Sequence, residues 1–215
     1  MVARIKFTNE INNLVNSVLI MSARLEKTID TVIKNLDDKN EYLAKQIVEN
    51  DDIFDKDEHD IEKKCLKLVL TQSPVASDWR KIVAIMKMIS DIERIGDHCA
   101  DISKYTMHLA TEHSVELPKY FHDMLDVIRN MVHNSIICFN DSDTVLAEKI
   151  IKTDDIVDKY FYDFRKDIEV LIEQNPKDTE QYINYLMIAK YVERIADHTT
   201  NIAEWVIFIV KNELK

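Results

Sequence analysis

Pairs of carboxylates four residues apart are the features of this chain best suited to chemistry. Asp51 and Asp55 form one pair, and Glu93 and Asp97 form another. Residues at i and i+4 lie on the same face of an α-helix, so each pair would present its oxygen atoms side by side. Oxygen ligands suit hard cations such as iron(III), manganese, magnesium and calcium, and zinc or iron(II) can also occupy such sites. The spacing therefore predicts metal binding wherever these segments are helical.

Both pairs recur about 100 residues later in the chain. Asp154 and Asp158 repeat the first pair at an offset of 103, and Glu193 and Asp197 repeat the second at an offset of 100. The neighbouring residues repeat as well, since positions 51–56 resemble 154–159 and positions 93–98 resemble 193–198. A nearly constant offset indicates an internal duplication.

The pairs fall on the apolar stripes of their expected helices. At about 100° per residue, Glu93 and Asp97 share a face with Ile82 and Ile89. A desolvated charge costs on the order of several kcal/mol, so carboxylates on a packed face need cations to neutralise them. Flanking polar residues on the same faces complete the set of candidate metal ligands, which is Asp51, Asp55, Glu93, Asp97, Asp101, Asp154, Asp158, Glu193, Asp197, Asn201 and Glu204.

An alternative interpretation is that these acids are solvated surface charges, as acids four residues apart usually are. The recurrence on four helices, in register across a duplication, favours metal binding instead. His98 and His198 directly follow two of the acids, but we do not count them as ligands.

Composition predicts the elements that must position these acids. Gly96 is the only glycine and the chain has three prolines, whereas about fifteen glycines and ten prolines are typical of this length. Hairpin turns depend on glycine, so the chain is expected to be all-α. Pro74 and Pro176 each follow a good N-cap residue, Ser73 and Asn175, and should begin long helices. With the polar breaks, six helices are expected over residues 5–36, 40–71, 74–112, 118–140, 143–174 and 176–213.

Six long helices joined by short loops should pack as two tandem, antiparallel three-helix bundles related by a pseudo-twofold axis. The duplication predicts a first repeat over residues 1–113 and a second over residues 114–215.

Charge and hydropathy exclude several classes of partner. A net charge of −11 with no cluster of lysine and arginine predicts no binding to nucleic acid. No stretch of about eighteen apolar residues and no signal peptide are found, so we expect a cytoplasmic protein without membrane insertion. Cys65, Cys99 and Cys138 are widely spaced and odd in number, which predicts buried thiols rather than disulfides or a thiolate zinc site.

Two segments resemble the signature of a known family. The sequence QSPVASDWR at 72–80, followed by ISDIERIGD at 89–97, is similar to the signature of PhoU proteins, the phosphate-uptake regulators of bacteria. The sequence YVERIADH at 191–198, followed by NIAE at 201–204, resembles its second copy. The likeness spans nearly the whole chain, and only the N-terminal helix is undistinctive.

The resemblance implies two similar three-helix bundles, a homodimer, and multinuclear iron or zinc clusters on the E/D-x-x-x-D motifs. It also implies a role in restraining the phosphate-starvation response, through contact with the ATPase subunit of the phosphate ABC transporter and with a membrane sensor histidine kinase. One departure stands out, because the family tends to have asparagine where this chain has Asp101, whereas Asn201 fits the pattern. The extra negative charge is expected to make the first site bind metal more tightly.

Two other functions are compatible with the acids. The protein could be a metal-buffering helical scaffold without a signalling role. A di-iron enzyme would need Glu-x-x-His pairs on facing helices, and none of the seven histidines has an acid three residues before it. We therefore expect that the chain is not an enzyme.

Overall fold

The structure, a computed structural model, describes residues 2–72 and 74–212, with the side chains of residues 2–6 excluded. Within these ranges every regular element is helical, which confirms the all-α prediction. The elements are α1 (Val2–Asp38), α2 (Glu41–Glu49), α3 (Asp52–Gln72), α4 (Ala76–Ala110), α5 (Tyr120–Asp141), α6 (Thr144–Gln174), the 3-10 turn η1 (Pro176–Asp178) and α7 (Thr179–Lys211).

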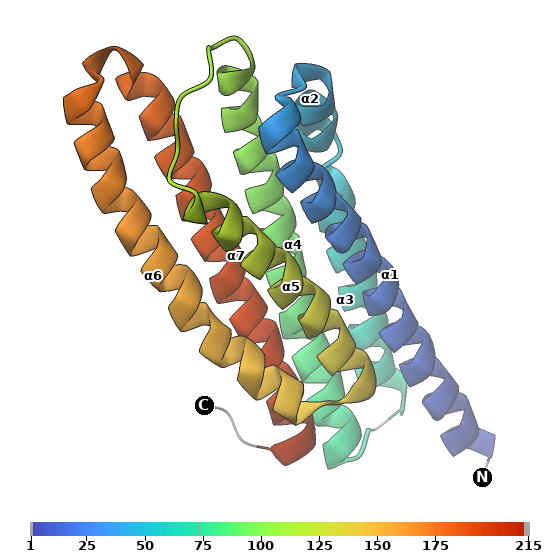
Figure 1. Cartoon of the computed structure of the whole chain (residues 1–215). Helices are drawn as coiled ribbons and strands as arrows, with labels where there is room; N and C mark the ends of the chain where they lie inside the picture. Colours follow the sequence, from blue (N-terminus) through green and yellow to red (C-terminus); the bar gives the residue numbers. More distant parts are fainter. Residues whose placement is uncertain (1, 73, 213–215) are drawn as a thin grey trace.

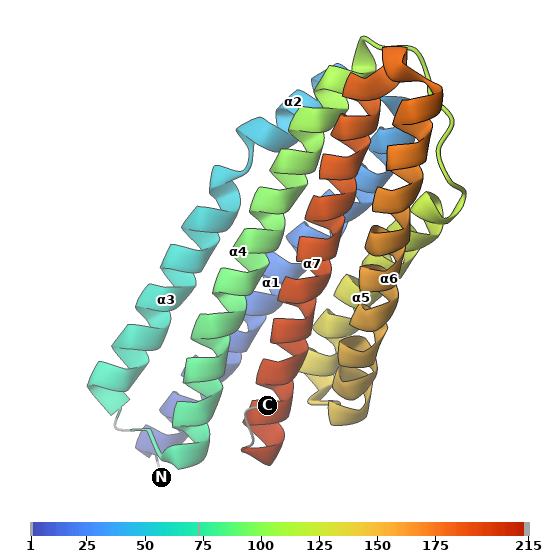
Figure 2. The same ribbon diagram turned by 90° about the vertical axis from the view of Figure 1, so that its left-hand side faces the viewer.

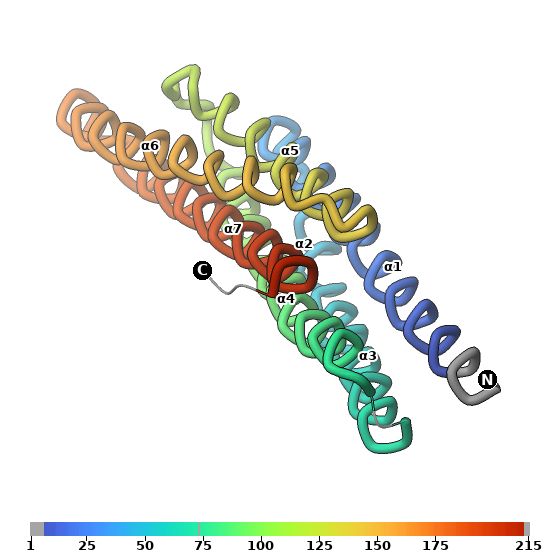
Figure 3. The backbone as a smooth tube through the Cα atoms, turned by 90° about the horizontal axis from the view of Figure 1, so that it is seen from below, coloured from blue at the N-terminus to red at the C-terminus, as the bar shows by residue number. Residues whose placement is uncertain are grey.

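The helices form two antiparallel bundles packed against each other, as the duplication predicts (Figure 1). In the first bundle α4 contacts α1, α2 and α3, and in the second α7 contacts α5 and α6. The most extensive contact of all joins α4 to α7, which run side by side through the centre of the molecule (Figure 2). Viewed from below, α1 also lies against α5 (Figure 3). The proposed repeat boundary between residues 113 and 114 falls in the connection between α4 and α5, and it stays a prediction.

A chain with one glycine must end its helices in another way. Lys39, Ser142 and Asn212 adopt positive φ angles of 46°, 55° and 60°. This conformation costs a non-glycine residue roughly 1–2 kcal/mol. At the corner between α1 and α2 the side chain of Asn35, which is 1% exposed, compensates by bonding both the N–H and the C=O of Asn40 at 3.0 and 3.1 Å. The corner is therefore fixed by a side chain rather than by glycine.

The expected helix over residues 40–71 is divided into α2 and α3. The amide of Asn50 donates from its side chain to the carbonyl of Gln46 at 2.7 Å, and its backbone N–H bonds Gln46 and Ile47. Asparagine competes for backbone partners in this way and so favours helix ends. Asp51 therefore lies at a turn between two helices instead of within one long helix.

The proline predictions have different outcomes at the two sites. Pro176 occupies the first turn of η1, which leads directly into α7. In contrast, α4 begins at Ala76 with Val75 as its N-cap, so Pro74 precedes the helix. The predicted cap Ser73 and the predicted helix end at residue 213 lie outside the described residues.

Candidate metal centre

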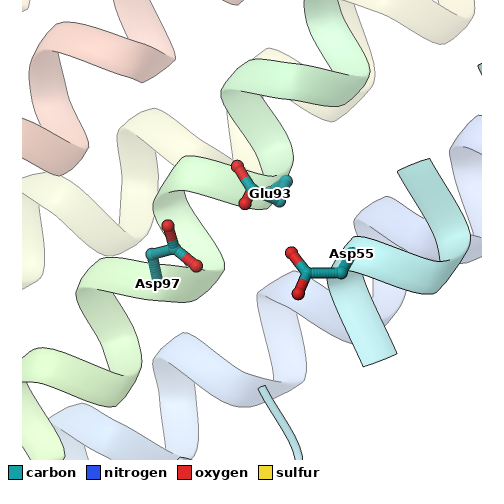
Figure 4. A group of neighbouring side chains, drawn as sticks. All are labelled: Asp55, Glu93 and Asp97. Carbon is teal, nitrogen blue, oxygen red and sulfur yellow. The ribbon is translucent and has the colours of Figure 1, made fainter. Parts of the chain in front are cut away.

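Three of the predicted ligands converge between α3 and α4. One carboxylate oxygen from each of Asp55, Glu93 and Asp97 lies within 4.8 Å of the others. Figure 4 shows Asp55 pointing from α3 toward the two acids of α4. Residues brought together from positions about 40 apart in the sequence thus form an all-oxygen group of the kind that hard cations bind.

Close packing of α3 on α4 makes this convergence possible. A Cβ atom added at Gly96 would lie 2.6 Å from Cδ2 and 2.8 Å from Cγ of the Phe54 ring. Phe54 precedes Asp55 and is 4% exposed, and Gly96 precedes Asp97. The missing side chain of the only glycine therefore lets the acids of the two helices approach each other.

The packed position of the acids changes their electrostatics. Glu93 is 8% exposed, and burial together with the charge of Asp97 raises its pKa to about 7. Burial also raises the pKa of Asp97. Among the residues that the structure describes, Arg94 is the one cation that touches both: its Nε lies 3.4 Å from Glu93 and its Nη1 lies 3.0 Å from Asp97. Arg94 is mostly exposed, so its charge is screened by water and leaves the acids incompletely neutralised.

Two further predicted ligands border this group. Burial, followed by the charges of Asp97 and Asp55, raises the pKa of Asp51 to about 6. Asp101 lies near enough to add to that shift, but its Oδ1 accepts a hydrogen bond from Lys104 at 2.8 Å. The extra charge of Asp101 is thus partly offset by a lysine on the same helix.

The second bundle brings its acids together more loosely. Burial and the charges of Asp158 and Asp197 raise the pKa of Asp154 to about 6, and burial and the charge of Glu193 raise that of Asp197. Glu193 accepts a hydrogen bond from Lys190 at 2.5 Å. Among the described residues, the only three ligand groups within 4.8 Å of one another are those of the first bundle.

Asn201 and Glu204 occupy other surroundings on α7. The amide of Asn201 donates to Asp91 at 3.0 Å, and His198 Nδ1 lies 2.9 Å from the same oxygen. Asp91 belongs to α4, so these contacts join the two repeats. Glu204 is half-buried and belongs to none of the three-acid groups of the described chain. Both residues stay predicted ligands only.

Sequence reasoning missed Asp91, although a signal for it exists. Asp91 precedes Glu93 by two residues, which places it about 160° away around the helix. Ile95 and Ile102 fall within about 40° of Asp91, so this face of the helix is apolar too, which indicates that the helix is covered on both sides. His98 and His198 also face the contact between α4 and α7, where their ring centroids lie 5.5 Å apart.

The residues present fit a bound cation. Asp154 Oδ1 is buried and has no hydrogen-bond partner among the described residues. Buried polar atoms are normally satisfied, and a cation between the acids would satisfy this one. In both bundles carboxylate oxygens predominate and no cysteine takes part, which suits iron, manganese, magnesium or calcium and also permits zinc.

Both repeats of the chain match a known protein family. The model described as the PhoU domain matches the chain twice, over residues 18–106 and 121–206. The chain belongs to the PhoU family. The first match contains Asp55, Glu93 and Asp97, and the second contains the corresponding acids Asp158, Glu193 and Asp197.

Similar proteins cover nearly the whole of this PhoU-family chain. The phosphate-specific transport system accessory protein PhoU homolog of Borreliella burgdorferi is 32% identical over 212 residues, which is 96% of this chain and 95% of that protein. The homolog of Aquifex aeolicus is 30% identical over 189 residues, or 88% and 86% of the two chains. The crystal structure of the phosphate transport system regulatory protein PhoU from Streptococcus pneumoniae matches with a TM-score of 0.91 at 28% identity, covering 97% of this chain and 99% of that one.

Proposed function

We propose that this chain regulates phosphate uptake and the phosphate-starvation response from the cytoplasm. The observation that carries this proposal is the double match to the PhoU domain, together with relatives that are named as accessory proteins of the phosphate-specific transport system. Its partners would be the ATPase subunit of the phosphate ABC transporter and a membrane sensor histidine kinase. The protein would be a homodimer. It would act by contacting these partners and not by catalysis.

The acid clusters would hold metal ions, with iron or zinc as the first candidates. Asp51, Asp55, Glu93 and Asp97 would hold the first cluster, bordered by Asp101. The support is the convergence of Asp55, Glu93 and Asp97. Burial also raises the pKa values of Asp51 and Glu93. Bound cations would supply the positive charge that holds the carboxylates of different helices together. They would thereby fix α3 against α4.

In the second bundle Asp154, Asp158, Glu193 and Asp197 would hold the equivalent cluster. The unpartnered oxygen of Asp154 supports this assignment. One carboxylate oxygen of Glu193 already accepts a hydrogen bond from Lys190. The side chain of Lys190 would have to move when metal binds to that oxygen. The second site should bind metal more weakly than the first, because its acids converge less closely.

Gene deletion and complementation test the regulatory role. At high phosphate, deletion should derepress phosphate-regulated transcription, and the wild-type gene should restore repression. Unchanged transcription and unchanged phosphate uptake after deletion would contradict the proposal.

Complementation with E93Q/D97N tests the role of the metal. These neutral isosteres keep the shape of the side chains but weaken cation binding. The matched control is E169Q/E173Q, because Glu169 and Glu173 have the same spacing on the exposed face of α6. If the metal signals, only the control should restore repression, and it alone should capture the transporter ATPase subunit in a pull-down. Full activity of a metal-free E93Q/D97N variant would refute a signalling role for the metal.

A further inference from the structure

The connection between α3 and α4 exposes apolar side chains at one end of the molecule. Leu66, Leu70, Val75 and Trp79 are 46%, 84%, 52% and 46% exposed. They are four of the thirteen exposed large hydrophobic residues of the described chain, and they are concentrated in one hairpin. Single exposed hydrophobic residues are ordinary, whereas a cluster marks an interaction surface. We call these four residues, with the basic residues beside them, the α3–α4 tip.

Basic residues lie close in sequence to these apolar residues. Between positions 63 and 81 the chain has five basic residues and one acidic residue, whereas its net charge is −11. Lys63 and Lys67 are exposed, and their spacing from Leu66 and Leu70 places all four on one side of α3. The basic members of the tip are Lys63, Lys64, Lys67, Arg80 and Lys81.

The tip lies at one end of the protein. In Figures 1 and 2 the end of α3 and the start of α4 lie at the extremity of the bundle where α1 also begins. No helix of the described residues is long and apolar enough to cross a membrane. Any contact of the tip with lipid would therefore be made at the bilayer surface.

We propose that the α3–α4 tip binds the surface of an anionic lipid bilayer. Exposed leucines and a tryptophan can enter the region between headgroups and acyl chains, where tryptophan is enriched. Lysines beside them keep their charges at the headgroups while their methylene groups lie along apolar surface. Anionic lipids attract each basic residue, and the acidic remainder of the protein is repelled. The charge distribution thus orients the molecule with the tip toward the membrane.

Lipid fits this surface better than a second protein does. Protein–protein interfaces are depleted in lysine, whereas three lysines are interspersed with the apolar residues here. This contact with lipid is separate from the proposed regulatory role and does not depend on it. It would concentrate the protein at the membrane by a contact with lipid alone.

Flotation of the full chain with lipid vesicles tests this proposal. Vesicles of phosphatidylcholine with about one third phosphatidylglycerol should carry the protein, and pure phosphatidylcholine should not. Each basic residue near an anionic surface contributes about fivefold in affinity, so K63Q/K67Q should weaken binding by about 25-fold. Leu70→Glu should weaken it at least tenfold. In a Trp205→Phe background, the fluorescence of Trp79 should shift to shorter wavelength when anionic vesicles are added.

Matched variants at other exposed positions control for general effects of charge. Val170 on α6 is 49% exposed, so Val170→Glu should bind vesicles like the wild type. Circular dichroism would confirm that every variant is folded. Equal binding to neutral and anionic vesicles, no binding to either, or undiminished binding of folded Leu70→Glu would overturn the proposal. Conversion of a dimer to a monomer by Leu70→Glu in sedimentation, without any loss of vesicle binding, would identify the tip as a contact between copies instead.

Discussion

Replacing Gly96 by alanine should separate the helices that carry the first acid cluster. The new Cβ would lie 2.6 Å from the Phe54 ring, a distance that atoms in folded proteins do not tolerate. The ring is buried and cannot swing into solvent, so either the ring or the whole of α3 must shift. Since Asp55 follows Phe54 and Asp97 follows Gly96, the shift would also move the carboxylates apart.

Two opposing effects set the change in the free energy of unfolding that Gly96→Ala causes. Overpacking of a core costs about 1–3 kcal/mol. Alanine in place of glycine inside a helix stabilises by about 1 kcal/mol. The net effect of Gly96→Ala should be a loss of about 1 kcal/mol in the free energy of unfolding, or a decrease of about 2–4 °C in Tm for a chain of this size.

A double-mutant cycle measured by urea denaturation isolates the contact. The second repeat has Val157 and Ala196 at the positions equivalent to Phe54 and Gly96, so the double variant Phe54→Val/Gly96→Ala recreates its pairing. In the Phe54→Val background, Gly96→Ala should stabilise the protein by about 1 kcal/mol because only the helix propensity remains. The coupling free energy between the two sites should be about 1–3 kcal/mol. If Gly96→Ala stabilised the wild-type background by the full effect of helix propensity, there would be no coupling between positions 54 and 96. That result would refute the close-packing argument.

Three other measurements follow from the structure. Burial raises the pKa of Glu93 from 4.5 to about 7, so the metal-free native state binds this proton more tightly than the unfolded chain does. The contribution of Glu93 to the free energy of unfolding should therefore fall as the pH rises from 4.5 to about 7. Urea titrations in the presence of chelator should show this trend, and E93Q should weaken it. Burial raises the pKa of Cys65 and Cys138 to about 12, so both thiols should react with a thiol reagent only after unfolding, and rapid labelling of the native protein would contradict their burial. Asp91→Ala should cost about 1–3 kcal/mol in thermal or urea denaturation because it leaves the partly buried His198 without its acceptor, and an unchanged stability would show that the contact contributes nothing.

The sequence predicts the parts of the fold that depend on periodicity. Apolar spacing and the scarcity of glycine predict long helices, and the 100-residue offset predicts two bundles. The face of Glu93 and Asp97 is also predictable, because it depends only on the angle per residue. The structure adds that Asp55 meets both acids from the neighbouring helix.

Features that depend on specific side-chain contacts could not be predicted in this way. The break after α2 arises from a hydrogen bond between the Asn50 side chain and a backbone carbonyl, which no periodic pattern reveals. The sequence places Asn201 beside the acids of its own helix, whereas its amide bonds Asp91 across the contact between the repeats. Both depend on which groups tertiary packing brings within reach.

Metal content provides the most direct test of the central claim that acids from different helices bind cations together. The wild type, E93Q/D97N, E193Q/D197N and the combined variant would be purified without chelator and compared by elemental analysis and calorimetric titration with iron, zinc and manganese. The account predicts that the wild type binds metal. Each double substitution should remove the metal bound in its own bundle, and the combined variant should bind no metal at these sites. Equal metal binding by all four proteins, or no binding by the folded wild type, would contradict it.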